Sequence, residues 1–218
     1  MRLRPDQTFE AFVPSPTSAV AFGLATALAG AQSDAPRLLL LCGPPGVGKT
    51  HLLRAIVARA FRQSRSGLII QMTAADLIQR LLAGLAEGSS RFPLPPADLL
   101  VVDDLHVLSD KARTQVEVGR LFQTLVDRGG RVACASGGAV ARIQVLAEAV
   151  ERLKGGKVIE IGPPTPQEMR RILLRHTTAL GLRLRAPTTT VLADQARGDV
   201  RRAIGAVTRL QFEQSLRA

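Results

Sequence analysis

Short apolar runs alternate, up to residue 164, with longer stretches whose apolar positions recur every three or four residues. Residues 38–42 (LLLLC) and 99–102 (LLVV) are continuously apolar, as is typical of strands buried on both faces of a parallel sheet. Residues 51–61 (HLLRAIVARAF) instead place an apolar stripe along one side of a helix. Further strands are predicted at residues 67–72, 131–136 and 158–161, and further helices at residues 18–29, 74–85, 112–128 and 143–153. This alternation predicts an α/β fold with a parallel five-stranded sheet flanked by helices.

The pattern changes after residues 162–164 (GPP), which close the last predicted strand. From there only helical periodicity is found, at residues 166–180, 188–197 and 200–216. We therefore expect two parts, an α/β core over residues 1–164 and a small helical lobe over residues 165–218.

One motif lies between the first apolar strand and the helix that follows it. Residues 43–50 read GPPGVGKT, a complete G-x-x-x-x-G-K-T phosphate-binding loop. A strand that feeds a glycine-rich turn and then a helix aims backbone N–H groups and the helix dipole at one anion. Such a loop binds ATP or ADP, with the lysine on the β- and γ-phosphates and the threonine hydroxyl on Mg²⁺; the alternative is a purely structural glycine turn. The predicted set is Gly43, Pro44, Pro45, Gly46, Val47, Gly48, Lys49 and Thr50.

Two carboxylates follow the apolar run at residues 99–102. An open parallel sheet binds its ligands at the carboxyl ends of its strands, so Asp103 and Asp104 are expected at the nucleotide. We assign Mg²⁺ to Asp103, and orientation of the attacking water to Asp104. An Asp-Asp pair alone would indicate a turn or a helix cap. Together with the upstream loop it forms a Walker A and Walker B pair.

Composition adds a basic charge and little else that is specific. The net charge is +11, and residues 151–218 carry 13 basic against 6 acidic side chains. A basic lobe can contact nucleic acid or an acidic protein, although 25 of the 29 basic residues are arginine, as coding bias could produce. No apolar stretch approaches the roughly 18 residues of a membrane span. We expect a soluble, cytoplasmic protein without membrane contact, in which Cys42 and Cys134 are buried thiols.

The motifs together resemble an AAA+ ATPase, and more narrowly the bacterial replication initiator family DnaA. Residues 8–13 (TFEAFV) are similar to the family's opening T-F-x-x-F-V, which lines one side of the adenine pocket. The phosphate loop matches through its His51-Leu52-Leu53 extension, and Asp103-Asp104-Leu105 falls in the family's spacing of D-D-I-Q-F-L. The resemblance spans about residues 6–212. It implies that Phe12, Val13 and His51 also belong to the cofactor-binding set, and that the helical lobe is an AAA+ lid.

The same resemblance implies roles for two arginines. Arg152 lies where the family has its arginine finger, which projects into the nucleotide of a neighbouring subunit and offsets charge in the transition state. Arg201, in Gly198-Asp199-Val200-Arg201, lies at the sensor 2 position and would reach the γ-phosphate from the lid. The alternative for each is one more solvated arginine in a basic lobe.

Three departures from the family pattern qualify the expected activity. Residues 135–137 (ASG) replace a Thr-Ser-Asp type sequence at the end of the sensor 1 strand, so we expect slow Mg²⁺-dependent ATP hydrolysis. Gly155 replaces a tryptophan near the finger. The sequence stops after the lid, so we expect no helix-turn-helix DNA-binding domain, and its beginning shows no segment that would bind the sliding clamp.

Two functional hypotheses follow, together with a simpler alternative. The first is a DnaA-like regulatory ATPase that controls initiation of chromosome replication by docking other AAA+ subunits, either an initiator or a second copy. The second is a helicase loader or transposition helper that acts on single-stranded or target DNA. Separately, the basic C-terminal lobe is a candidate for direct DNA contact. The simpler alternative is a degenerate paralogue that binds nucleotide only for stability, against which the intact Lys49, Asp103, Asp104 and Arg201 argue.

Overall fold

A computed structural model describes residues 7–63, 67–86, 94–182 and 185–215. Its centre is a five-stranded parallel sheet in the order β2-β3-β4-β1-β5. The strands are β1 Leu38–Gly43, β2 Ile69–Thr73, β3 Leu99–Asp103, β4 Arg131–Gly137 and β5 Gly156–Glu160. The α/β fold expected from the apolar runs is thereby confirmed.

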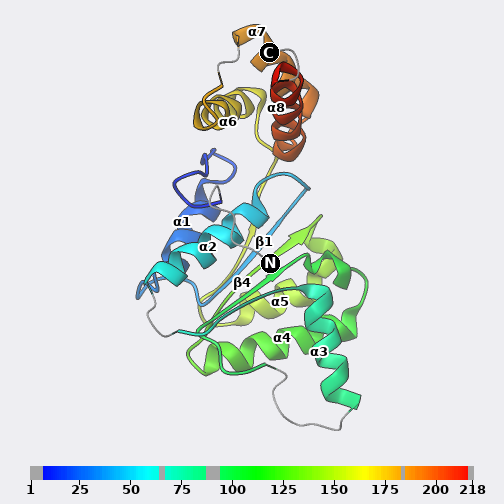
Figure 1. The fold of residues 1–218 in the computed structure, drawn as a ribbon. Coiled ribbons are helices and arrows are strands. Elements are labelled where there is room, and N and C mark those ends of the chain that lie inside the picture. The colour runs from blue at the N-terminus through cyan, green and yellow to red at the C-terminus, as the bar shows by residue number, and fades with distance from the viewer. Residues whose placement is uncertain (1–6, 64–66, 87–93, 183–184, 216–218) are drawn as a thin grey trace.

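Helices cover both faces of the sheet, as Figure 1 shows. The core helices are α1 Ala19–Ala29, α2 Lys49–Gln63, α3 Ala74–Ala86, α4 Ala112–Asp127 and α5 Gln144–Arg152, with the short 3-10 helices η1 Leu105–Leu108 and η2 Val140–Ile143. Alternate residues of β1 belong to two different clusters: Leu38 and Leu40 pack toward α3, α4 and α5, whereas Leu39 and Leu41 pack toward α1 and α2. Both faces of the strand are therefore buried, which explains its unbroken apolar sequence.

Three further helices form a group at one end of the molecule (Figure 1), α6 Pro166–Ala179, α7 Ala186–Ala196 and α8 Val200–Ser215. They share an apolar cluster of their own, built around Met169, Leu173 and Val207. A capping box begins α6: the Thr165 side chain accepts from the Glu168 N–H, and the Glu168 carboxylate accepts from the Thr165 N–H. We call this group the lid.

Several local expectations need correction. The helix after the phosphate loop begins at Lys49 rather than His51, because the last two residues of the motif already form its first turn. The first helix, expected from residue 18, begins at Ala19, and the Ser18 hydroxyl before it accepts from the Ser15 N–H at 2.9 Å rather than capping the helix. Cys134 lies in the middle of β4. Residues 87–93 lie outside the described residues.

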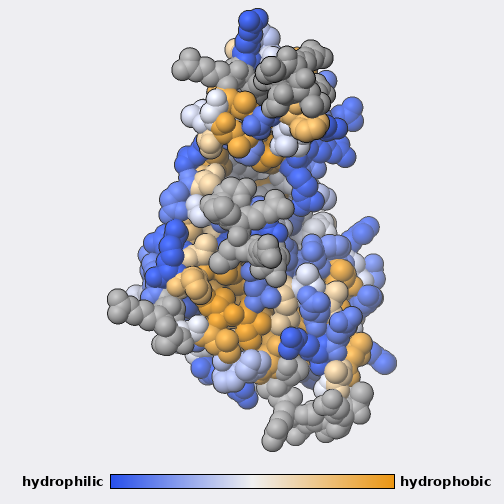
Figure 2. All heavy atoms as spheres, in the orientation of Figure 1, coloured by the Kyte–Doolittle hydropathy of each residue, from blue (hydrophilic) through white to orange (hydrophobic). Residues whose placement is uncertain are grey.

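The surface is uneven in character. On the face shown in Figure 2, apolar side chains gather most densely on the α/β core, and hydrophilic side chains dominate much of the rest. Strand β2 lies at an edge of the sheet, and all of its residues are partly exposed. Within the described ranges, no helix is both long enough and apolar enough to cross a membrane.

Candidate functional site

The phosphate loop lies where β1 ends and α2 begins, and its glycines adopt backbone conformations that other residues avoid. Gly43, Gly46 and Gly48 have φ values of 139°, 79° and 101°. A Cβ atom on Gly43 would collide with the Ile161 carbonyl oxygen, and one on Gly48 would lie 2.8 Å from the Phe12 ring. Only glycine both adopts these positive φ values readily and lacks the Cβ atom for which there is no room. The result is a tight, open backbone turn of the kind that a phosphate group fills.

Lys49 is folded back over this loop and is 8% exposed. Its Nζ donates to the carbonyl oxygens of Gly43 and Pro44, both at 2.7 Å. Burial lowers the pKa of Lys49 below its usual value, while the nearby charge of Asp103 raises it in part. The ammonium group is therefore poorly solvated and its two hydrogen-bond partners are neutral. Such a donor suits a phosphate oxygen.

The carboxylates of Asp103 and Asp104 reach the same edge of the sheet from the end of β3. Asp103 is half-buried, and its Oδ1 accepts from the Asp104 N–H at 2.8 Å. Asp104 has a φ of 63°, a left-handed conformation that turns the chain sharply into η1. Both carboxylates act on the pKa of Lys49. The structure thus brings Lys49, Asp103 and Asp104 together, with the half-buried Thr50 in the first turn of α2.

Aromatic side chains form the opposite side of the loop. Phe12 is buried and packs edge-on against His51, with 5.2 Å between ring centroids, and it stacks on Phe22 at 5.6 Å. His51 Nε2 lies 2.8 Å from the Thr8 carbonyl oxygen, which holds residues 8–12 against α2. Val13 follows and is half-buried. The residues expected at an adenine base therefore lie beside the phosphate loop.

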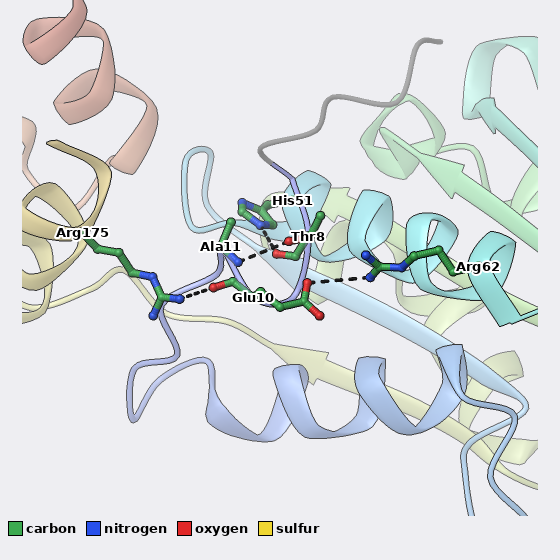
Figure 3. A network of polar contacts seen from close by, with 6 residues as sticks. All are labelled: Thr8, Glu10, Ala11, His51, Arg62 and Arg175. Carbon is green, nitrogen blue, oxygen red and sulfur yellow. Dashed lines mark hydrogen bonds and ion pairs between the residues drawn. The ribbon is translucent and has the colours of Figure 1, made fainter. Parts of the chain in front are cut away.

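Figure 3 shows that residues 8–12, which we call the N-terminal turn, lie between the core and the lid. On the core side, the Glu10 carboxylate lies 3.7 Å from Arg62 of α2. On the lid side, Arg175 of α6 donates to the Glu10 carbonyl oxygen. Within the turn, the Ala11 N–H donates to the Thr8 hydroxyl at 3.4 Å. One short segment therefore touches the loop, the helix after it and the lid.

The lid also contacts the phosphate loop directly. The Val200 N–H donates to the Gly46 carbonyl oxygen at 3.1 Å, and the Asp199 side chain packs over Gly46. Asp199 Oδ1 accepts from the Arg201 and Arg202 N–H groups at 2.9 and 3.2 Å, which caps α8. The charge of Arg201 contributes to lowering the pKa of Lys49, so the guanidinium lies within electrostatic range of the loop.

Arg152 has a different setting. It ends α5, its side chain is 78% exposed, and it forms an ion pair with Glu148 one turn earlier at 3.0 Å. The structure therefore places this predicted site residue on the surface, bound within its own helix.

The sequence interpretation missed two residues at the site. Asp199 belongs to the Gly-Asp-Val-Arg motif, and its side chain lies over Gly46 of the loop. His106 occupies the glutamine position of the family's D-D-I-Q-F-L, and its Nδ1 lies 3.8 Å from Asp104 Oδ1. A Cβ atom on Gly137, at the end of β4, would lie 3.5 Å from that same Nδ1. The histidine at residue 106, where the family pattern has glutamine, is the feature of the sequence that distinguishes this position.

The two cysteines are free and buried beneath the loop. Burial raises the pKa of the Cys42 thiol to about 11. Cys134 is also buried, and its pKa is raised as well. Both thiols are thus held in the protonated form and serve as small apolar core residues.

Comparison with known proteins identifies what the chain is similar to. The model of the bacterial DnaA ATPase domain matches residues 3–160. The chromosomal replication initiator protein DnaA of Mesorhizobium japonicum is 31% identical over 98% of this chain, which covers 46% of that protein. Domain III of the Thermotoga maritima replication initiation protein DnaA superposes with a TM-score of 0.84 at 24% identity, over 99% of this chain and 92% of that one. AMPPCP-bound DnaA from Aquifex aeolicus superposes with a TM-score of 0.80 at 25% identity, over 96% of this chain and 66% of that one.

Proposed function

The chain belongs to the family of bacterial DnaA ATPase domains, and from this premise we propose that it is an AAA+ nucleotide switch that regulates initiation of chromosome replication. It would act by contact with other AAA+ subunits, an initiator or a second copy. The chain spans about half the length of the curated relatives it matches, so the activity of those whole proteins is part of the proposal.

Nucleotide binding is the first element of the proposal. The support is a glycine loop whose positive φ angles leave a backbone cradle, a buried lysine with neutral partners, and a similar protein that binds AMPPCP. We assign the phosphates of ATP or ADP to the loop and to Lys49, and Mg²⁺ to Thr50 and Asp103. Bound Mg²⁺ would neutralise phosphate charge. The base lies against Phe12, Val13 and His51, which are beside the loop.

Slow hydrolysis is the second element. Asp104 orients the attacking water, and Arg201 reaches the γ-phosphate from the lid. Arg201 is supported by the docking of α8 on the loop, where the Val200 N–H reaches Gly46. Arg152 serves a neighbouring subunit rather than its own. An exposed guanidinium that forms an ion pair within its own helix can exchange that partner, because such surface pairs contribute little stability.

The third element is the division of labour within the chain. Residues 1–164 are the nucleotide-binding core and residues 165–218 are the lid subdomain. The lid has its own apolar cluster, and it meets the phosphate loop through polar contacts at Gly46. A subdomain attached in this way can change position when the nucleotide changes.

One observation carries the proposal: the lid helix that bears Arg201 docks on the phosphate loop, so a change of phosphate occupancy changes what the lid contacts. A protein that reports its nucleotide through lid position suits a regulator of other AAA+ subunits. A helicase loader or transposition helper would share this site. It would differ in needing DNA, for which the basic lid surface is the contact expected from charge.

The test is stimulation in trans. We expect the protein, loaded with nucleotide, to accelerate ATP hydrolysis by the replication initiator of the same organism. The Arg152→Ala variant should lose most of this effect. Arg120→Ala is the matched control, because Arg120 is also an exposed arginine paired within its own helix, with Glu117 at 2.8 Å. Equal stimulation by the parent and the Arg152 variant would remove the finger assignment.

The loader alternative is separated by DNA binding. The regulator should bind single strands weakly and without regard to nucleotide. Tight binding that requires ATP and weakens steeply with salt would favour the loader.

A further inference from the structure

The carboxyl edge of the sheet has a gap in its side chains at β4. Gly137 ends this strand and pairs with Gly43, the first residue of the phosphate loop. Gly138 then exchanges two backbone hydrogen bonds with Gly43, at 3.0 and 3.3 Å. The end of β4 therefore lies directly beside the phosphate loop, at a position where Gly137 contributes no side chain. The family pattern described above has a carboxylate there.

The imidazole of His106 occupies the space beside Gly137. Its Nδ1 lies 3.5 Å from where a Gly137 Cβ would be, and 3.8 Å from Asp104 Oδ1. With Nδ1 facing Asp104, Nε2 is the second polar atom of the ring. The side chain is 47% exposed, so it can still contact a ligand. The polar side chain of His106 in η1 thus lies beside Gly137, the residue of β4 that has no side chain.

Packing does not require this imidazole. The η1 helix is anchored by Leu105 and Leu108, which are fully buried in the core, while the ring between them points outward. Removing the ring should therefore leave η1 in place. Because this half-exposed polar side chain lies at the edge of the sheet where Lys49, Asp103 and Asp104 gather, it is available to contact a bound ligand.

We propose that His106 contacts the terminal phosphate of the bound triphosphate, replacing the side chain missing at Gly137, and thereby sets the preference of the site for ATP over ADP. This rests on the proposed nucleotide binding. Asp104 faces Nδ1 and orients the ring, which leaves Nε2 to donate to a γ-phosphate oxygen. The β-phosphate is held by the loop in either nucleotide, so the contact discriminates between them.

Equilibrium binding tests this without any turnover. We would measure the affinities of ADP and of AMPPCP, with Mg²⁺, for the parent, His106→Ala and His106→Gln. The alanine variant should lose about tenfold of its affinity for AMPPCP with little change for ADP, as expected for one charge-assisted hydrogen bond. Glutamine has a side-chain N–H and should restore most of the loss. His176→Gln, in the lid helix α6, is the control and should match the parent.

The ring can also be observed directly, because the chain has three histidines. With ¹³C-labelled histidine, the signal lost in His106→Gln identifies His106. AMPPCP should shift this signal clearly more than ADP does, whereas the His51 signal, from the adenine side, should respond alike to both. Unchanged His51 and His176 signals in the variants would show that the fold is intact.

The outcomes separate two failures. If the parent binds both nucleotides and His106→Ala keeps the parent's ratio of affinities, or if the His106 signal responds equally to ADP and AMPPCP, the inference is wrong while nucleotide binding stands. If the parent binds neither nucleotide, the proposed function is wrong and the inference is overturned with it.

Discussion

The phosphate loop is approached from two sides that differ in how they are held. On the core side, the loop follows a strand buried on both faces, and Gly43 is tied to β4 and packed against Ile161. On the lid side, the described residues make polar contacts: Val200 to Gly46, Asp199 over Gly46, and Arg175 to the N-terminal turn. The first side rests on apolar burial, whereas the second rests on single hydrogen bonds of about 1 kcal/mol each.

This difference shows which part of the site can respond to a ligand. Moving the core side would unpack two apolar clusters that share the sheet. Moving the lid side would break a few polar contacts and leave its own cluster intact. Elements that move in switching proteins come from the less stable part of a structure. The core should therefore set the affinity for nucleotide, including any preference that His106 adds, and the lid should change position according to the nucleotide that is bound.

The largest expected effect lies on the core side. Lys49→Ala should lower the affinity for ADP and AMPPCP by at least about 100-fold, because a charged donor to the phosphates is removed. Calorimetric titration would measure it. The variant should remain folded by circular dichroism, and an affinity equal to the parent's would exclude the phosphate-loop assignment.

A pair of glycine substitutions sharpens the contrast in stability. Gly43→Ala should lower the free energy of unfolding by about 3 kcal/mol, because its Cβ meets a backbone carbonyl at a positive φ. Gly205→Ala, within the lid helix α8 and with open space around its Cβ, should raise helix stability by about 0.5–1 kcal/mol. Urea unfolding and hydrogen exchange of α8 would measure the two. Equal effects of the two variants would contradict the assignment of strain to the loop.

On the lid side, Arg201→Ala should reduce the preference for AMPPCP over ADP by about tenfold, because one charged contact with the γ-phosphate is lost. Its neighbour provides the control: the Arg202 guanidinium is 3.7 Å from Asp199 and mostly exposed, so Arg202→Ala should bind as the parent does. A loss shared by both variants would indicate a general effect of lid charge instead.

The smallest expected effect concerns the N-terminal turn. Arg175→Ala should weaken ADP binding by about threefold and speed amide exchange in α6, since one hydrogen bond to the Glu10 carbonyl is removed. Arg171→Ala, on the same helix and exposed, is the matched control. Unaltered exchange in the Arg175 variant would mean that the turn does not help to hold the lid.

Much of the core could be predicted because its signals are local. The unbroken apolar run of β1 predicts a strand buried on both faces of the sheet. A glycine-rich motif of this spacing between a strand and a helix is typical of a phosphate-binding loop. Asp103 and Asp104 could be placed because carboxyl ends of parallel strands share one edge. The exact first residues of the helices could not be predicted as well. The Ser18 hydroxyl accepts from the Ser15 N–H rather than from the first turn of α1, because these two local hydrogen bonds compete for the same side chain.

By itself, the sequence determined the sheet, the glycine-rich loop after β1 and the three C-terminal helices, because spacing and hydrophobic period act over a few residues. Only the tertiary structure decided that Arg175 of α6 contacts Glu10, that α8 docks on Gly46, and that His106 fills the space beside Gly137. These contacts join side chains and backbone from elements far apart in the chain. Their formation depends on how separately folded surfaces meet, and no local pattern records that geometry.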